Sequence, residues 1–194
     1  MQWGASAAGR NGEASRTTKA VRNAVGPSTI PTMNIDDLEC AATSLDAVEV
    51  RRSGVHGYGV FAVRTVRAGQ QIGTYAGRRY AAGVSHPAWD DQLTYLFGLS
   101  DGSMIDGAQG GNATRHLNHA CAPNVEAVES YDAADELVLD IQAIRDIAGG
   151  EELFLDYSLD IDGQDPAEYP CQCGAPDCRG TLAAPEEGPP VVDA

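Results

Sequence analysis

The sequence predicts a mainly β domain built from short strands. From residue 46 onward, short apolar runs are cut by glycines, as in Gly59–Val63 and Gln71–Tyr75, and this texture is typical of strands and turns rather than helices. The stretch 137–147 has apolar residues at alternate positions, which indicates a strand with one buried face. Tyr95–Phe97 continues the same pattern.

The length of 194 residues predicts one domain with terminal extensions. Residues 1–45 are rich in Ala, Gly, Ser and Thr and show no sustained apolar period, so we expect a largely disordered extension. Residues 46–162 form the main domain, and residues 163–182 form a cysteine-bearing segment. Residues 183–194 contain three prolines and no aromatic residue, which predicts a loose tail.

Charge is distributed unevenly along the chain. The net charge is −15, and after residue 115 only Arg145 and Arg179 oppose 18 acidic residues. Such a surface repels phosphate backbones, so the sequence disfavours direct nucleic-acid binding and favours a basic protein partner. Solubility alone is the simpler explanation of the charge. Apolar runs stay well short of the roughly 18 residues that cross a bilayer, so no membrane association is expected.

The cysteines favour a metal site over disulfides. Three of the five lie between residues 171 and 178, and a bond between Cys171 and Cys173 would be strained. The N-terminus lacks the apolar stretch of a signal peptide, so we expect an intracellular, reduced protein. Small size and the preference for arginine over lysine favour a bacterial cytoplasm over a eukaryotic nucleus, with export to a host left open. The oligomeric state is undefined.

A glycine cluster runs from Gly54 to Gly59. Glycines allow a backbone to approach a ligand closely. The dinucleotide fingerprint, however, needs a following helix and an acid about 20 residues further on, whereas here a strand pattern follows and Arg79 occupies that position. Taken alone, the cluster indicates a glycine-lined hairpin as readily as a ligand site.

Four blocks follow one another in a specific order. They are the Gly57-Tyr-Gly59-Val-Phe61 opening, the Arg115 to Asn124 block that contains Asn118-His-x-Cys121, the Glu152-Leu-Phe-Leu-Asp-Tyr157 block and the terminal Cys171-Gln-Cys173-x4-Cys178. Together they resemble the SET-domain protein lysine methyltransferases with a C-terminal post-SET zinc motif, over residues 46–182. The resemblance implies a SET-domain fold of several small sheets with a pseudoknot, plus a short zinc-stapled post-SET segment.

The resemblance also implies a site for S-adenosylmethionine. The Asn118 side chain would bond the amino-acid part of this cofactor, and His119 would contact the adenine mainly through main-chain groups. Outside this block, an Asn-His pair is more often a turn or a satisfied core pair. Arg115 could equally form a structural ion pair, and the ring of His116 could simply pack. The candidate cofactor-binding residues are Gly57, Tyr58, Gly59, Arg115, Asn118 and His119.

The implied reaction is methyl transfer to the side-chain amine of lysine in a basic protein, such as a histone or histone-like protein. A free lysine has a pKa near 10.4, so only about one in 2,500 is neutral at pH 7, and deprotonation costs roughly 4.6 kcal/mol. An aromatic channel lowers that pKa by desolvation, without a general base. We assign Tyr157 and Tyr95 as candidate catalytic residues. Leu155 replaces the Phe or Tyr that relatives usually carry, which leaves the number of methyl groups open.

The resemblance supplies a fourth zinc ligand, Cys121, to join Cys171, Cys173 and Cys178 in a structural site. Two other functions remain open from the sequence. One is a catalytically silent SET module that binds a basic partner, and the other is a zinc-stapled adaptor. The joint presence of Asn118, His119 and Tyr157 favours the enzyme.

Overall fold

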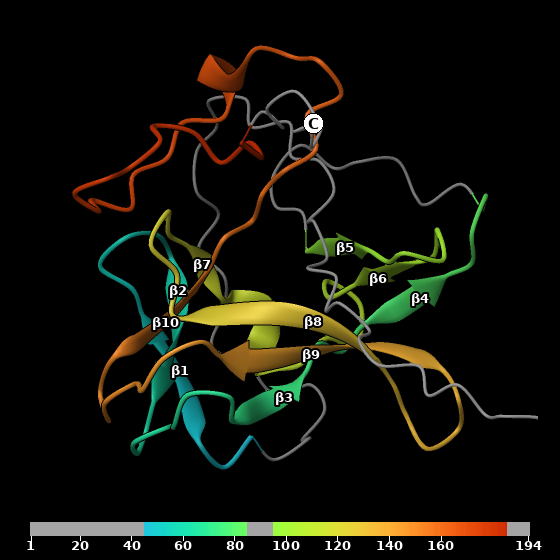
Figure 1. Cartoon of the computed structure of the whole chain (residues 1–194), viewed down its shortest axis with the longest axis horizontal. Coiled ribbons are helices and arrows are strands. Elements are labelled where there is room, and N and C mark those ends of the chain that lie inside the picture. The colour runs from blue at the N-terminus through green and yellow to red at the C-terminus, as the bar shows by residue number, and fades with distance from the viewer. Residues whose placement is uncertain (1–44, 85–94, 186–194) are drawn as a thin grey trace, which may run out of the picture.

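The computed structural model describes residues 45–84 and 95–185 (Figure 1). The predicted N-terminal extension lies outside the described residues except for Leu45, and so does the tail from residue 186. The described chain consists of short strands in three sheets, with two short 3₁₀ helices, η2 (Ala113–His116) and η3 (Pro166–Glu168). The predicted mainly β fold is confirmed. Within these ranges, no helix is long and apolar enough to cross a membrane.

The largest sheet carries most of the predicted motifs. Its strand order is β1-β2-β10-β7, where the strands are β1 (Val48–Arg52), β2 (Tyr58–Ala62), β10 (Glu152–Leu155) and β7 (Asn118–His119). β10 pairs antiparallel with β2 but parallel with β7, where Phe154 is opposite Asn118 and Leu155 is opposite His119. This parallel pair brings the Asn-His segment beside the strand that leads to Tyr157, although the two are remote in the sequence.

Two three-stranded antiparallel sheets complete the fold (Figure 1). One has the order β3-β9-β8, with β3 (Gln71–Thr74), β9 (Leu137–Ala143) and β8 (Val125–Tyr131). The other has the order β4-β6-β5, with β4 (Arg78–Tyr80), β6 (Met104–Asp106) and β5 (Leu96–Gly98).

The alternating stretch predicted for residues 137–147 is a strand over Leu137–Ala143. Leu139 and Ile141 are fully buried, which confirms the predicted inward face. The strand ends earlier than the pattern suggested because Ile144 turns outward, with 45% of its surface exposed. Ile147 returns to the core through an isolated bridge with Val66.

The packed chain continues beyond the predicted start of the C-terminal tail. Ala183 is buried and forms a parallel bridge with Leu159, just after the β10 segment. Tyr169 is only 2% exposed and accepts a backbone bond from Leu182. The chain is therefore still packed at residue 183, because it returns against Leu159 there.

Candidate functional site

The glycine turn is held by the Asn118 side chain. Its Nδ2 atom lies 3.2 Å from the carbonyl oxygen of His56, 3.0 Å from that of Tyr58 and 2.9 Å from Oε1 of Glu152. Because all three neighbours are oxygen acceptors, the network fixes the amide orientation. Asn118 therefore joins β7 to the turn before β2. Its Oδ1 is the end available to accept a hydrogen bond from a ligand's amino group.

The two glycines of this turn are required for different reasons. Gly57 has φ +49°, a left-handed conformation that favours glycine. Gly59 instead lacks space, since a Cβ there would lie 2.0 Å from Oε1 of Glu152 and 3.2 Å from Nδ2 of Asn118. The space beside Gly59 is thus filled by the chain's own side chains, a packing role that the sequence did not predict.

We predict that Gly59→Ala weakens cofactor binding about 10-fold, or about 1.4 kcal/mol. The added methyl group displaces the Glu152 carboxylate, so the Asn118 amide loses one acceptor and rotates. Calorimetric titration with S-adenosylmethionine measures the affinity. Gly54→Ala is the matched control, because a Cβ there meets no atom within 4 Å. Equal affinities in the two variants would contradict the prediction.

A group of rings lies beside the turn. The ring of the buried His116 makes edge contacts with Tyr58 at 6.1 Å and with Tyr95 at 6.3 Å between centroids. Arg115 donates from Nε to Nε2 of His116 at 3.1 Å, and its guanidinium lies 5.9 Å from the Tyr95 ring centroid. The structure thus brings together three predicted site residues, Tyr58, Tyr95 and Arg115, around the ring of His116. His116 itself packs as an aromatic ring.

His116 gives a testable pH dependence. Burial, and then the charge of Arg115, lower its pKa to about 4, whereas a histidine in the unfolded chain titrates near 6.5. The unfolded state therefore binds more protons in this window, and stability falls as the pH drops from about 6.5 towards 4. His119 has the same shift. We predict that His116→Phe removes about half of the loss between roughly pH 7 and 5, in urea unfolding at both pH values. An unchanged loss would refute this assignment.

The ring of His119 connects the backbone of Tyr157 to Cys121. Its Nδ1 accepts the backbone N–H of Tyr157 at 3.1 Å, so the proton of the neutral ring is on Nε2, which lies 3.4 Å from Sγ of Cys121. Burial lowers the pKa of His119 to about 4, although Asp156 opposes the shift. Both ring nitrogens of His119 are thus engaged within the protein.

Three phenols converge near Tyr157. The Tyr157 hydroxyl donates to the carbonyl oxygen of Leu117 at 2.7 Å, and that of Tyr75 donates to the carbonyl oxygen of Tyr95 at the same distance. Burial, and then the neighbouring Tyr95, raise the pKa of Tyr157 above its usual value, and burial raises those of Tyr75 and Tyr95. All three are therefore neutral phenols at neutral pH. With its proton committed to Leu117, the Tyr157 oxygen can accept a hydrogen bond from an amine.

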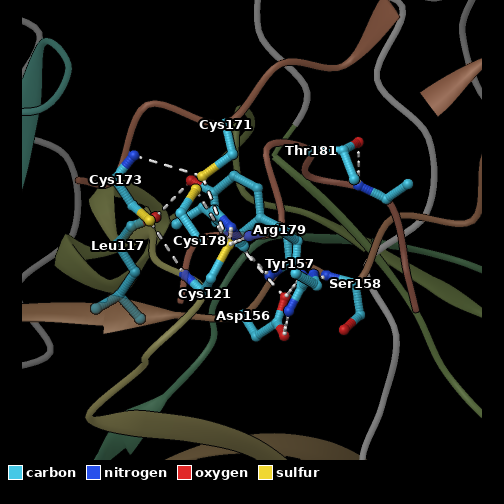
Figure 2. A network of polar contacts seen from close by, with 12 residues as sticks. Leu117, Cys121, Asp156, Tyr157, Ser158, Cys171, Cys173, Cys178, Arg179 and Thr181 are labelled. Atoms are coloured by element: carbon cyan, nitrogen blue, oxygen red, sulfur yellow. Dashed lines mark hydrogen bonds and ion pairs between the residues drawn. The ribbon is translucent and has the colours of Figure 1, made fainter. Parts of the chain in front are cut away.

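Four cysteines meet at the other end of β7 (Figure 2). The Sγ atoms of Cys121, Cys171, Cys173 and Cys178 all lie within 4.8 Å of one another, and none of the four forms a disulfide. Sγ of Cys121 is 3.7 Å from that of Cys171 and 3.8 Å from that of Cys178. Zinc with Zn–S bonds near 2.3 Å in a tetrahedron requires sulfur atoms about 3.8 Å apart. The four cysteines predicted as ligands are thus brought together at a spacing that fits zinc.

Backbone donors around the sulfurs also fit a thiolate site. The N–H groups of Cys121, Cys173, Arg179 and Gly180 point to the sulfurs of Cys173, Cys171, Cys121 and Cys178, respectively, at 3.4 to 3.5 Å. Each sulfur therefore accepts at least one backbone hydrogen bond, which stabilises the charged form that a metal requires. Burial raises the pKa values of Cys121 and Cys171, whereas backbone donors outweigh burial at Cys173 and lower its pKa to about 6.

Arg179 is the site residue that sequence reasoning missed. Its NH1 and NH2 atoms donate to Oδ2 and Oδ1 of Asp156, each at 2.7 Å. Asp156 also accepts the backbone N–H of Ser158 at 3.0 Å, so its carboxylate makes structural hydrogen bonds. The only available signal was its position directly after Cys178. A bare carboxylate beside Tyr157 would keep an amine protonated, and Arg179 neutralises this one.

The described chain is therefore a small β domain in which a glycine turn, an Asn-His pair and the partly buried Tyr157 lie close to a cluster of four cysteines. The family model of the SET domain matches residues 57–158, which is more than half of the chain. The chain belongs to the SET-domain family. The terminal cysteine cluster is consistent with a post-SET motif.

Relatives and a solved structure agree with this assignment. The chain is 34% identical over 137 residues to "Histone-lysine N-methyltransferase, H3 lysine-4 specific" of Saccharomyces cerevisiae, covering 68% of this chain and 13% of that protein. It is 34% identical over 145 residues to the human "Histone-lysine N-methyltransferase 2B", covering 72% of this chain and 5% of that protein. The chain thus spans a small part of these relatives.

Among solved structures, the polycomb repressive complex 2 of Chaetomium thermophilum matches with a TM-score of 0.51 and 35% identity. The match covers 57% of this chain and 15% of the matched chain of that complex.

Proposed function

We propose that this protein transfers a methyl group from S-adenosylmethionine to the side-chain amine of a lysine in a basic protein. The observation that carries the proposal is the position of Tyr157. Its neutral hydroxyl is fixed on the Leu117 carbonyl, and the Asn118 amide that holds the glycine turn lies one residue further along the same segment. Relatives named as histone-lysine methyltransferases support the reaction class.

When bound, S-adenosylmethionine would supply an electrophilic methyl group: the amine nitrogen would form a bond to the methyl carbon as the carbon–sulfur bond breaks and its electron pair stays on sulfur. The residues supply position and dehydration. The Tyr157 oxygen accepts from the amine and aims its lone pair, while Tyr95 helps to exclude water. Asn118 Oδ1 orients the amino group of the cofactor. Water takes the amine proton, because the carboxylate next to Tyr157, that of Asp156, is already paired with Arg179.

We propose that Cys121, Cys171, Cys173 and Cys178 hold a structural zinc ion. Zinc with four thiolates has no open position for chemistry, so its contribution is to order the segment that contains three of the ligands. The chain directly after this segment contacts Asp156 through Arg179. The ion therefore stabilises the backbone next to Tyr157 without touching the substrate.

The substrate that fits the surface is a histone or histone-like protein. Exposed acidic side chains are concentrated on the chain after Tyr157: Asp160, Asp162, Asp165, Glu168 and Asp177. They favour approach of a lysine that lies among other basic residues, an attraction that salt weakens. We propose the reaction for the compartment that holds such proteins, the bacterial cytoplasm, with delivery to a host as the other route.

Transfer of a labelled methyl group to purified core histones and to a basic bacterial nucleoid protein tests the proposal. We expect label on lysine, equimolar S-adenosylhomocysteine and slower transfer at higher salt. The same proteins with acetylated lysines are the control and should accept no label. Cofactor binding without transfer to any basic protein would overturn the proposal in favour of a silent binding module.

A further inference from the structure

We propose that Arg179 is a positioning residue that couples the cysteine site to Tyr157. The inference rests on the proposed function for its kinetic part only. Figure 2 shows Arg179 between the sulfur cluster and Asp156. Its backbone N–H points to Sγ of Cys121 at 3.4 Å, and its guanidinium forms a two-point pair with Asp156. Arg179 thus contacts both a proposed metal ligand, Cys121, and the residue that precedes Tyr157.

Asp156 in turn binds the backbone of Ser158, the residue that follows Tyr157. Its Oδ1 accepts the N–H of Ser158, whose φ of +43° is a left-handed conformation that costs a non-glycine residue on the order of 1 kcal/mol or more. The chain therefore makes a strained turn directly after Tyr157. The Asp156 carboxylate stabilises that turn, and Arg179 fixes the carboxylate.

A second connection starts from the same sulfur. Nε2 of His119 lies 3.4 Å from Sγ of Cys121, and Nδ1 of the ring accepts the N–H of Tyr157. Tyr157 is thus held on its own N–H through His119 and on the following N–H through Asp156 and Arg179. The two connections differ in one respect that permits a test, because only the Arg179 side chain can be changed without altering a metal ligand or its ring neighbour.

Charge explains why an arginine suits this place. Four thiolates with one zinc ion carry a formal charge of −2, and Asp156 adds a further negative charge nearby. The guanidinium is attracted by both. Two parallel N–H···O bonds also fix the orientation of the carboxylate, which a lysine would hold through a single point charge.

The first test compares Arg179→Gln with wild type. We expect the variant to retain one zinc ion per chain by elemental analysis, because all four ligands remain. We expect kcat to fall about 10- to 100-fold while KM for S-adenosylmethionine stays within about threefold, since the change displaces Tyr157 rather than the cofactor turn. Arg179→Lys should recover part of the loss. Arg67→Gln, which breaks the exposed pair with Asp146 at 2.7 Å, is the matched control.

A double-mutant cycle then tests whether Arg179 acts through Asp156. We expect the combined Arg179→Gln and Asp156→Asn variant to be no slower than the slower single variant. Multiplied losses would overturn the proposal, and so would an unchanged kcat in Arg179→Gln. Loss of zinc from that variant would also overturn it, since Arg179 would then act on the metal site instead.

Hydrogen exchange provides a readout that needs no activity. In the zinc-loaded variant Arg179→Gln, we expect the amides of Tyr157 and Ser158 to exchange about 10-fold faster than in wild type. Removal of zinc should accelerate the same amides in wild type and have a smaller effect in the variant, where only the His119 connection remains. If wild type transfers no methyl group, the proposed function fails while this coupling can still hold. Unchanged exchange at both amides would overturn the coupling itself.

Discussion

Tyr157→Phe is expected to lower methyl transfer about 100-fold or more while the protein remains folded. The variant keeps the ring, which packs 5.3 Å from the His119 ring, and loses the hydroxyl that donates to Leu117. One lost hydrogen bond costs about 1 kcal/mol of stability, or a few degrees in melting temperature. The rate falls far more, because the amine then lacks the oxygen that aims its lone pair. Single-turnover transfer to a lysine peptide measures the effect.

The matched control is Tyr80→Phe, which removes another buried hydroxyl, bonded to Gln109 at 3.1 Å and belonging to β4. It should lose similar stability and keep its transfer rate. Affinity for S-adenosylmethionine should be unchanged in both variants, because neither touches the Asn118 turn. A Tyr157→Phe rate within about threefold of wild type would show that the hydroxyl does not position the amine.

The part of the fold that the sequence could predict is the part with regular patterns. Alternation of apolar residues identified the β9 strand, since its inward side chains build the core directly. Its neighbour β8 went unrecognised, because its sequence interleaves glutamates with small apolar residues and burial there comes from pairing along its whole length with β9. The end of β9 was misplaced because Ile144 turns outward.

Contacts between remote residues explain what the sequence could not supply. The ligand set of four cysteines came from the resemblance, and no local spacing joins Cys121 to residues 50 positions away. Glu152 had no predicted role of its own, yet its carboxylate fills the space beside Gly59. Arg179 likewise acquires a role only when the post-SET segment returns against Asp156. In each case the chemistry depends on tertiary packing, which a linear pattern does not encode.

Zinc removal, or Cys173→Ser, is expected to abolish transfer while the three sheets remain folded. The segment from Cys171 to Cys178 contains little apolar surface of its own, so metal binding supplies its folding energy, about 10 to 16 kcal/mol in isolated zinc-binding peptides. Without the ion, four sulfurs at contact distance cannot all be thiolates. The contact between Cys121 and the backbone of Arg179 is then lost. The Arg179 side chain no longer holds Asp156, and the backbone around Tyr157 loosens.

The loosening should have a boundary that the structure defines. Tyr169 is buried in the core, and Ala183 pairs with Leu159, so both ends of the segment stay attached when the cysteines separate. We therefore expect faster hydrogen exchange over residues 170–181 and unchanged exchange in β2 and β9. Cys40→Ser, which leaves all four cysteines of the cluster unchanged, is the control. Restored zinc should restore transfer in wild type but not in Cys173→Ser. Full activity in zinc-free protein would mean that Arg179 and Asp156 stay paired without the metal, and that the ion has no part in catalysis.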